Sequence, residues 1–344
     1  YFGCGKGDAS GKRTFDPKQF QQNASLEQVK MIEIKLSQGA KPAHGGMLPK
    51  EKITPLIAEA RGLPDAPYYD CNSPPSHSAF TNPMELMHFI AQLRELSGGK
   101  PVGLKLCVGR PKEFCALARA MIETGVKPDF ITVDGGEGGT GAAPPEFSNH
   151  IGMPLAEGLT LVRNTLVGAG LTRMQSEHPG DDDIKLIASG KVLSGFSLVK
   201  TLASGADVCN SARAMMMALG CIQALKCNTN KCPTGIATQD PDLMAGLVVP
   251  TKAIRVQNFQ EQTVHAALEI TGAIGVTNPA SLQPNHIYKR VGTGTHGVIS
   301  YDELYPSVPF GCLLTGEAPP ALQASWNRAE TIVSKAHDGS NFDG

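Results

Sequence analysis

The stretch that decides the fold is VGLKLCVGRPKEFCALARAMIETGVKPDFITVDGG, residues 102–136. The apolar run Val102–Cys107 predicts a buried strand. Residues 111–124 have the apolar spacing of a helix, which we expect to end at Gly125. A second apolar run, Phe130–Val133, follows. A strand, a helix and another strand in this order predict a βαβ unit with parallel strands.

The same alternation continues on both sides of this unit. Further strands are predicted at Met31–Leu36, Ile184–Ser189 and Ala206–Asn210, and further helices at 83–97, 154–169, 195–204 and 211–224. Short, continuous apolar strands are typical of parallel sheets covered on both faces. The fold class is therefore α/β, as a (β/α)8 barrel or an open doubly wound sheet. In both, ligands bind at the carboxyl ends of the strands.

The bulk properties of the 344 residues indicate a globular protein. Hydrophobic residues make up 41 % of the chain, which is typical of globular proteins. The formal net charge of −1 gives no sign of the excess of basic residues that nucleic-acid-binding proteins carry. The nine cysteines are an odd number and unevenly spread, which favours metal or cluster chemistry in a reducing compartment over disulfides. We expect a cytoplasmic protein. Because the chain begins with Tyr1 rather than Met, a membrane anchor upstream of residue 1 stays open.

The last part of the chain has a different pattern. Residues 252–274 predict an amphipathic helix, with Ile254, Val264, Ala267 and Leu268 among the expected core residues. After Leu304 the periodicity ends, and Pro, Gly and polar residues become frequent. These observations predict a loosely packed tail after Leu304.

Three cysteines mark the stretch LGCIQALKCNTNKCPTGIATQD, residues 219–240. Cys221, Cys227 and Cys232 have the spacing C-x5-C-x4-C, with Pro233 directly after the last. Thiolates this close are soft ligands for an iron–sulfur cluster or for zinc. Three of them suit a cluster with one vacant corner, whereas zinc needs a fourth ligand and the motif contains no His. Three unliganded thiols are the alternative.

A glycine-rich loop, GGEGGTG at residues 135–141, follows the second strand of the central unit. It contains G-x-G-x-x-G, but Ala-Ala-Pro-Pro follows where a dinucleotide fingerprint requires a helix. A tight loop that lets a planar ligand or another loop approach closely fits better. Asp134 and Glu137 are the carboxylates at this strand end, and solvated loop positions are their alternative.

Two later strand ends, IASGK at 187–191 and NSARA at 210–214, precede predicted helices. Backbone N–H groups at two helix N-termini, together with Lys191 and Arg213, could bind a phosphate. Barrels commonly bind phosphate after their last two strands. Ordinary helix N-caps at these loops explain the same residues equally well.

Basic side chains occur in two more of the predicted strands or directly after them. Lys105 lies inside an apolar strand, where a buried ammonium needs a partner such as a cofactor. Lys35, Gln38 and Lys41 recur at the exit of the first strand, and Arg61 follows. Together these four could hold a dicarboxylate, while a solvated basic loop is the alternative.

These stretches, in this order, resemble the family of FMN-binding glutamate synthase-like proteins. The matching segments are KLSQGAKPAHGGMLP (35–49), SPPSHS (73–78), GLKLC (103–107), DGGEGGTGAAP (134–144), SGKVLSG (189–195) and ALGCIQALKCNTNKCPTGIATQDP (218–241). The likeness runs from near residue 15 to about 291, and the cysteine segment is the most specific part of it.

The resemblance implies a (β/α)8 TIM barrel that lacks its first strands in this chain and holds FMN. This partial barrel would span residues 1–291, and residues 292–344 would form a loosely structured C-terminal extension. It implies a 3Fe-4S cluster bound by Cys221, Cys227 and Cys232. The implied enzyme is an oxidoreductase of the EC 1.4 class. Its reduced FMN transfers hydride to the imine of 2-oxoglutarate and ammonia, which gives L-glutamate, and the cluster relays the electrons.

The resemblance also implies a role for each site residue. The flavin and its phosphate would be bound by Lys105, Asp134, Ser189, Gly190, Lys191, Ser211, Ala212 and Arg213. The substrate 2-oxoglutarate would face Lys35, Gln38, Lys41 and Arg61. Lys41 and Glu137 would be the catalytic residues, with Lys41 nearest the reacting carbon.

Some positions depart from the family pattern. Met47 stands where the family usually has Gln, His44 where it has Glu, and Glu137 replaces Asp. The chain shows no glutaminase domain, so we expect ammonia from solution or from an amidotransferase partner. A ferredoxin or an NAD(P)H-oxidising subunit would donate electrons. Two alternatives stay open: an enzyme of the methylamine–glutamate N-methyltransferase type with the same cofactors, and a non-redox phosphate-binding barrel with a zinc or thiol site.

Overall fold

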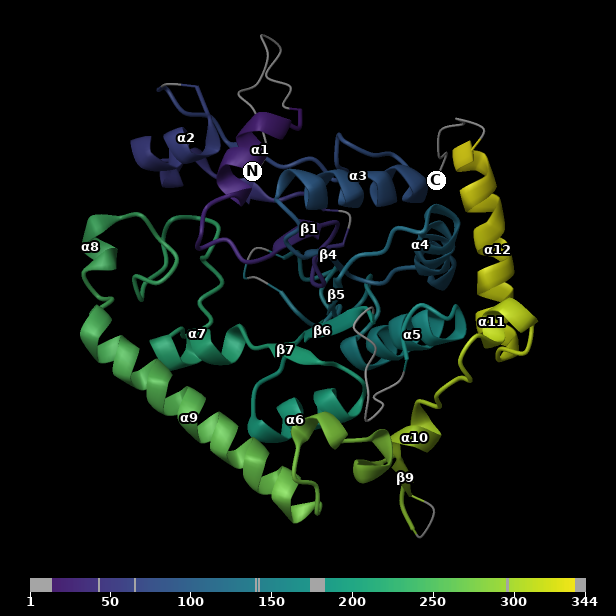
Figure 1. Cartoon of the computed structure of the whole chain (residues 1–344). Helices are drawn as coiled ribbons and strands as arrows, with labels where there is room; N and C mark the ends of the chain where they lie inside the picture. The colour runs from purple at the N-terminus through teal and green to yellow at the C-terminus, as the bar shows by residue number, and fades with distance from the viewer. Residues whose placement is uncertain are drawn as a thin grey trace.

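The computed structural model describes residues 14–42, 44–64, 66–139, 141, 143–173, 183–294 and 297–337. Residues 1–13 of the predicted barrel domain and residues 338–344 of the predicted C-terminal extension lie outside the described residues. A five-stranded parallel sheet forms the centre, in the order β1 (Ile32–Lys35), β4 (Val102–Leu106), β5 (Phe130–Asp134), β6 (Lys185–Ser189) and β7 (Val208–Asn210) (Figure 1).

The order of these strands decides between the two parallel architectures. Neighbouring strands in the sheet follow one another along the chain, apart from the short pair β2 and β3. In a doubly wound sheet the strand order reverses at a switch point. In a (β/α)8 barrel, consecutive strands lie side by side in the order of the chain, with no reversal. The predicted α/β barrel fold is therefore confirmed.

Helices connect the central strands. These are α4 (Pro111–Thr124) between β4 and β5, α5 (Leu155–Gly168) between β5 and β6, and α6 (Gly195–Ala203) between β6 and β7. The helix α3 (Pro83–Leu96) precedes β4, and α7 (Arg213–Leu219) follows β7. All five residues of β5 are buried, as expected for a central strand covered on both faces. The sheet register aligns Asp134 with Ser189, and Ser189 with Asn210, so the strand ends lie at one edge.

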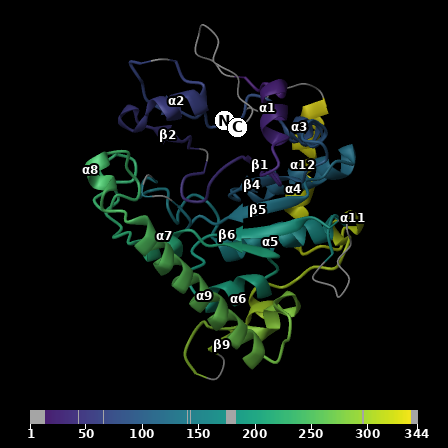
Figure 2. The same cartoon turned by 60° about the vertical axis from the view of Figure 1, so that its left-hand side comes forward.

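The connection from β1 to β4 is long and forms a unit of its own. It contains β2 (Met47–Leu48) and β3 (Cys71–Asn72), which pair antiparallel, with the 3-10 turn η1 (Lys50–Lys52) and α2 (Pro55–Arg61) between them. The helix α1 (Pro17–Ala24) precedes β1. In both views α2 lies on the same side of the molecule as α8 (Pro241–Met244) (Figures 1 and 2).

The predicted helix near 252–274 is present as α9 (Val249–Ala273), but part of its predicted core is wrong. Ala267 is 7 % exposed, whereas Ile254 is 59 % and Leu268 54 % exposed. The helix packs against α6 and α7 along a narrow stripe, which covers few of its apolar side chains. The helix expected over 211–224 already ends at Leu219, where Gly220 takes a left-handed conformation (φ 109°).

The prediction of a loosely structured C-terminal extension is wrong for its described part. That part forms β9 (Val298–Ser300), α10 (Tyr301–Leu304), α11 (Cys312–Thr315) and α12 (Pro320–His337). The strand β9 pairs antiparallel with β8 (Tyr288–Arg290), which lies just before the extension, as do η2 (Pro279–Ser281) and η3 (Pro284–His286). The helix α12 lies along α4 (Figure 1). Trp326 on α12 is 4 % exposed, and the guanidinium carbon of Arg119 lies 4.4 Å from its ring centroid. A second buried core therefore joins the extension to the outer side of α4.

None of the helices in the described ranges combines the length and the apolar character that a bilayer crossing requires.

Candidate functional site

The loops that follow the parallel strands meet at Asp134, the last residue of β5. Its buried carboxylate accepts a hydrogen bond from the backbone N–H of Gly39 at 2.9 Å. The ammonium of Lys105 lies 3.4 Å from the same oxygen. In the adjoining loop, the Gly135 N–H donates to the Ser189 carbonyl at 2.8 Å. The ends of β1, β4, β5 and β6 are thus joined by direct contacts, as the carboxyl edge of a parallel barrel requires.

Two further lysines, Lys35 and Lys41, lie at this strand edge with Lys105. The Lys35 ammonium donates to Gln38 Oε1 at 2.9 Å, and Lys41 is only 7 % exposed. Burial lowers the pKa of Lys35, and repulsion from Lys105 and then from Lys41 lowers it further. Lysines that repel one another prefer an anion between them. The arrangement suits a carboxylate or phosphate ligand.

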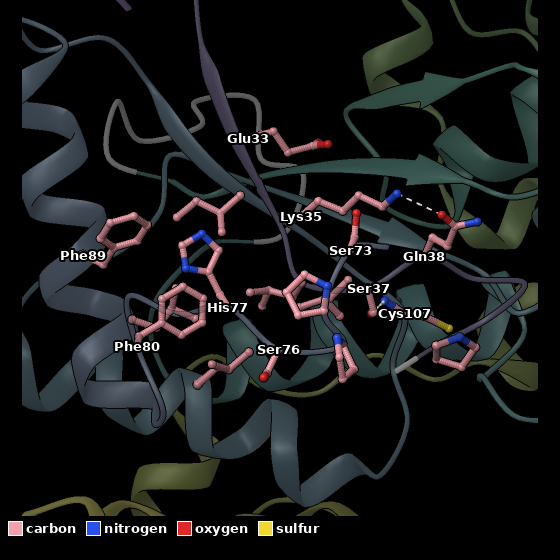
Figure 3. A pocket seen from close by; sticks show the side chains of 18 of the residues that line it. Glu33, Lys35, Ser37, Gln38, Ser73, Ser76, His77, Phe80, Phe89 and Cys107 are labelled. Carbon is pink, nitrogen blue, oxygen red and sulfur yellow. Dashed lines mark hydrogen bonds between the residues drawn. The ribbon is translucent and has the colours of Figure 1, made fainter. Parts of the chain in front are cut away.

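A pocket of about 2110 Å³ runs along β1 beside this edge (Figure 3). Lys35 and Gln38 line one end of it, and His77 lies at the other end, stacked on Phe80 with ring centroids 4.8 Å apart. The lining also includes Ser37, Ser73 and Cys107, which sequence analysis did not single out. Burial raises the pKa of the Cys107 thiol to about 11, so this cysteine is neutral at ordinary pH.

Two more predicted site residues, Glu137 and Arg61, lie on other segments of the chain. The Glu137 carboxylate accepts from the backbone N–H of Leu155, the first residue of α5, at 2.9 and 3.0 Å. This contact gives Glu137 an anchoring role at the helix N-terminus. Arg61 ends α2 on the long connection, and its predicted contact with the substrate stays a prediction.

The two loops expected to bind a phosphate are neighbours. They contain Ser189, Gly190 and Lys191 after β6, and Ser211, Ala212 and Arg213 after β7. The Ser211 hydroxyl donates to the Val192 carbonyl at 2.8 Å, which ties the two loops together. Arg213 donates to the Gly139 carbonyl at 3.1 Å and so reaches the glycine-rich loop. The cations of both loops therefore border one strand edge, a donor set that fits a phosphate group.

The cysteine loop, residues 220–240, leaves this edge after α7 and ends at α8. A Cβ placed on Gly141 would lie 2.7 Å from the Cys227 sulfur. The end of the glycine-rich loop therefore touches the second cysteine, and only glycine leaves room for the thiol. The Gln223 N–H lies 3.4 Å from the Cys221 sulfur as a hydrogen-bond donor.

Hydrogen bonds lower the pKa of the third cysteine. Burial alone would raise the pKa of Cys232, but hydrogen bonds outweigh it and lower the pKa to about 7. The donors are the Thr234 hydroxyl and the backbone N–H groups of Ala237, Thr234 and Ile236. Thiolates stabilised by surrounding N–H groups are typical metal ligands.

Among the described residues, no three His, Cys, Asp or Glu side chains lie close enough to hold one metal ion together. An iron–sulfur cluster distributes its thiolates over separate iron atoms, so they need not converge on one ion. The chemistry of this donor set, with the pKa of one thiol lowered by hydrogen bonds and another sulfur against the glycine-rich loop, fits such a cluster. The predicted flavin residues likewise fit FMN, since cations and a buried carboxylate line the strand ends.

Two residues of this region were missed by sequence analysis. Lys52 on η1 donates from its ammonium to the carbonyls of Cys227 and Ala237. Asn230, inside the cysteine loop, donates to the Glu51 carbonyl at 3.0 Å. No local pattern marks either residue, because their partners are more than a hundred positions away in the chain.

Known proteins share much of this sequence. The family model described as the conserved region in glutamate synthase matches residues 17–277. The glutamate synthase large subunit-like protein YerD of Bacillus subtilis is 37 % identical over 290 residues, which cover 84 % of this chain and 52 % of that protein. The archaeal glutamate synthase [NADPH] of Methanocaldococcus jannaschii is 35 % identical over 255 residues, covering 74 % of this chain and 47 % of that one.

The chain therefore spans about half the length of the curated relatives it matches. Among solved structures, a mandelate oxidase variant with an FMN adduct aligns at a TM-score of 0.40 with 14 % identity, covering 78 % of this chain and 59 % of that one. Since the family model covers most of the chain and includes both the strand-end loops and the three cysteines, this protein belongs to the glutamate synthase family.

Proposed function

We propose that this chain forms the flavin- and cluster-binding part of a glutamate synthase-like oxidoreductase of the EC 1.4 class. The proposed reaction reduces the imine of 2-oxoglutarate and ammonia to L-glutamate. One observation carries the proposal: Lys105 pairs with the buried Asp134, and Lys35 and Lys41 lie within electrostatic range at the same strand edge, which the cysteine loop borders. Family membership supports the reaction class.

In this proposal the lysines bind and polarise the substrate. Lys35 and Gln38, already joined at 2.9 Å, face a carboxylate of 2-oxoglutarate together with Arg61. Lys41, buried and close enough to Lys35 to lower its pKa, lies at the keto or imino carbon. A cation there stabilises the charge that develops during reduction and holds the carbon in place. Glu137 is the second proposed catalytic residue, at the loop that follows Asp134.

The cofactor residues follow the strand ends. Lys105 and Asp134 are proposed to border the flavin ring, and the loops at Ser189–Lys191 and Ser211–Arg213 to bind its phosphate. Cys221, Cys227 and Cys232 are proposed to bind a 3Fe-4S cluster. When bound, FMN supplies the hydride and the cluster supplies single electrons. The chain's own contribution is to orient the substrate and hold these groups at one edge.

The partners of the reaction are also part of the proposal. Ammonia comes from solution or an amidotransferase, and electrons come from a ferredoxin or an NAD(P)H-oxidising subunit. The uneven, odd set of nine cysteines supports a reducing, cytoplasmic location. A role in nitrogen assimilation follows from the proposed reaction. Met47 lies on β2 with 49 % of its surface exposed. Its thioether replaces the hydrogen-bonding amide of the Gln that the family usually has at this position. This difference keeps a substituted amine as a second candidate substrate.

The test has two parts. The protein, produced together with the first barrel strands that the resemblance implies are missing here, is loaded with FMN, iron and sulfide under anaerobic conditions. It should show flavin absorption bands with a broad cluster shoulder. A colourless protein that binds zinc instead would overturn the proposal. Turnover with 2-oxoglutarate and ammonia is then compared with turnover of glutamate and methylamine. Faster turnover of the second pair would assign the protein to the N-methyltransferase type.

The catalytic part is tested by Lys41→Ala. Because Lys41 is proposed at the reacting carbon, its loss should reduce turnover by roughly a hundredfold or more, the range of electrostatic contributions, and leave flavin content nearly unchanged. An equal fall of turnover and flavin content would show that Lys41 only supports the fold of the site.

A further inference from the structure

The turn η1 (Lys50–Lys52) contacts the cysteine loop, although the two are far apart in the chain. The half-buried ammonium of Lys52 donates to the Cys227 carbonyl and, at 2.8 Å, to the Ala237 carbonyl. These carbonyls lie 175 and 185 positions further along the chain. One ammonium therefore bridges a point next to the second cysteine and a point beyond the third.

A second contact joins the same two segments independently. The side-chain amide of Asn230 donates to the Glu51 carbonyl at 3.0 Å. The carbonyl oxygen of the same amide accepts from the Gln239 N–H at 2.7 Å and from the Thr238 hydroxyl at 3.1 Å. Asn230 thus connects two parts of the cysteine loop by hydrogen bonds and also connects the loop to η1.

The cysteine loop needs these contacts because its backbone conformation is unfavourable without them. Gln223, Leu225 and Asn230 all have positive φ angles, of 56°, 53° and 61°. Residues other than glycine keep this conformation only where surrounding contacts impose it. Two of the large side chains of the loop, Ile222 and Leu225, are each 67 % exposed, so burial contributes little to holding it.

Lys52 also connects the surroundings of two of the sulfurs. Ala237 accepts from Lys52 through its carbonyl and donates its N–H toward the Cys232 sulfur. Cys227, the other acceptor of Lys52, has its sulfur against Gly141 of the glycine-rich loop. A displacement of Lys52 would therefore release both cysteines from their neighbours together.

We propose that Lys52 is the positioning residue of the cysteine loop. Its ammonium fixes the spacing of Cys227 and Cys232 before any iron is bound, so that the thiolates are arranged to receive inorganic iron and sulfide. The iron-binding part of this inference rests on the proposed function, whereas the preformed spacing does not. Lys52 touches no substrate in this proposal and acts through the two cysteines.

The experiment uses the full chain without iron and measures how fast each cysteine is alkylated by iodoacetamide, read by mass spectrometry. Lys52→Met should raise alkylation of Cys227 and Cys232 roughly tenfold, since hydrogen bonds to a charged group no longer oppose opening of the loop. Cys115, fully buried under α12, should stay protected and so report that the core is intact.

Lys50→Met is the matched control. Lys50 lies on the same turn and is exposed, and its ammonium makes no hydrogen bond within the described ranges. Its removal takes away the same charge without touching the loop, so all alkylation rates should stay at the wild-type level. Unchanged rates at Cys227 in Lys52→Met, or an equal rise in Lys50→Met, would overturn the proposal.

Two further arms separate the possible failures. If Lys52→Met exposes Cys115, the milder Lys52→Gln replaces it, and the same comparison at Cys227 decides. Iron content after anaerobic loading is then measured on wild type and variants, with several-fold less iron expected in Lys52→Met. A wild-type chain that takes up no iron would reject the cluster in the proposed function, while the alkylation result would still decide the role of Lys52.

Discussion

Asp134 accepts a hydrogen bond from the Gly39 N–H at 2.9 Å, although the two residues stand 95 positions apart. Gly39 follows β1 and Asp134 ends β5, so the bond crosses over the end of β4, which lies between these strands. A Cβ on Gly39 would collide with the Gly135 carbonyl oxygen. The loops after β1 and β5 therefore meet as closely as backbones can, next to the Lys105 ammonium.

This relationship predicts the effect of Asp134→Asn. The amide keeps the shape of the side chain but loses the charge that pairs with Lys105 and strengthens the bond from Gly39. We expect the free energy of unfolding in urea to fall by about 1–3 kcal/mol. Asp242→Asn, at an exposed position on α8, is the control and should change it by less than about 0.5 kcal/mol. Equal effects of both changes would contradict the role of Asp134.

Substitution of Glu137 separates an anchoring role from a catalytic one. Glu137→Ala removes the acceptor for the Leu155 N–H and should lower the free energy of unfolding by about 0.5–2 kcal/mol, as for a lost helix cap. Glu137→Gln keeps an acceptor and should be closer to wild type in stability. A large loss of turnover in Glu137→Gln at near wild-type stability is expected if the carboxylate acts in catalysis. Retained turnover would leave Glu137 with the anchoring role alone.

Gly141→Ala tests the contact between the glycine-rich loop and the cysteine loop. The added methyl group would lie 2.7 Å from the Cys227 sulfur, so the sulfur has to move. Iron content after anaerobic loading should fall several-fold. Gly272→Ala adds the same methyl group to α9, where nothing lies within 4 Å, and should leave iron content unchanged. Full iron content in Gly141→Ala would show that the two loops separate freely.

The titration of Lys35 depends on its neighbours. Burial, and then repulsion from Lys105 and Lys41, lower its pKa, so the folded state binds this proton less tightly than the unfolded chain does. The charged ammonium therefore destabilises the fold below the folded pKa, and this penalty fades as the pH rises through that value. Lys105→Met should shift the Lys35 titration to higher pH in NMR of labelled lysines. Lys289→Met, at an exposed position on β8, should leave it in place.

Trp326 tests whether the C-terminal helix belongs to the fold. Trp326→Ala removes a buried ring that contacts Arg119 and leaves a cavity between α4 and α12. We expect a loss of about 3–5 kcal/mol in the free energy of unfolding. Arg328→Ala, at an exposed position on α12, is the control and should lower the free energy of unfolding by less than about 0.5 kcal/mol. Similar values for the two variants would mean that α12 does not stabilise the barrel.

The failures of sequence analysis have physical reasons. The spacing of Leu322, Trp326, Ala329 and Val333 is helical and could have indicated α12, but the Pro and Gly residues before it obscured the signal. For α9 the helix itself was predicted correctly. Which of its apolar side chains are covered was not, because that depends on where α6 and α7 lie. Periodicity shows that a face is apolar and does not show its partner.

The sequence by itself determined the parallel α/β fold, the residues that follow each strand, and the family. These features are local: apolar runs, glycine loops and cysteine spacing are properties of short segments. Only the tertiary structure decided which of these segments touch. The bonds from Gly39 to Asp134 and from Lys52 to Cys227 join residues 95 and 175 positions apart. Such contacts form only when the folded barrel brings its strand ends to one edge, so no local pattern in the chain can encode them.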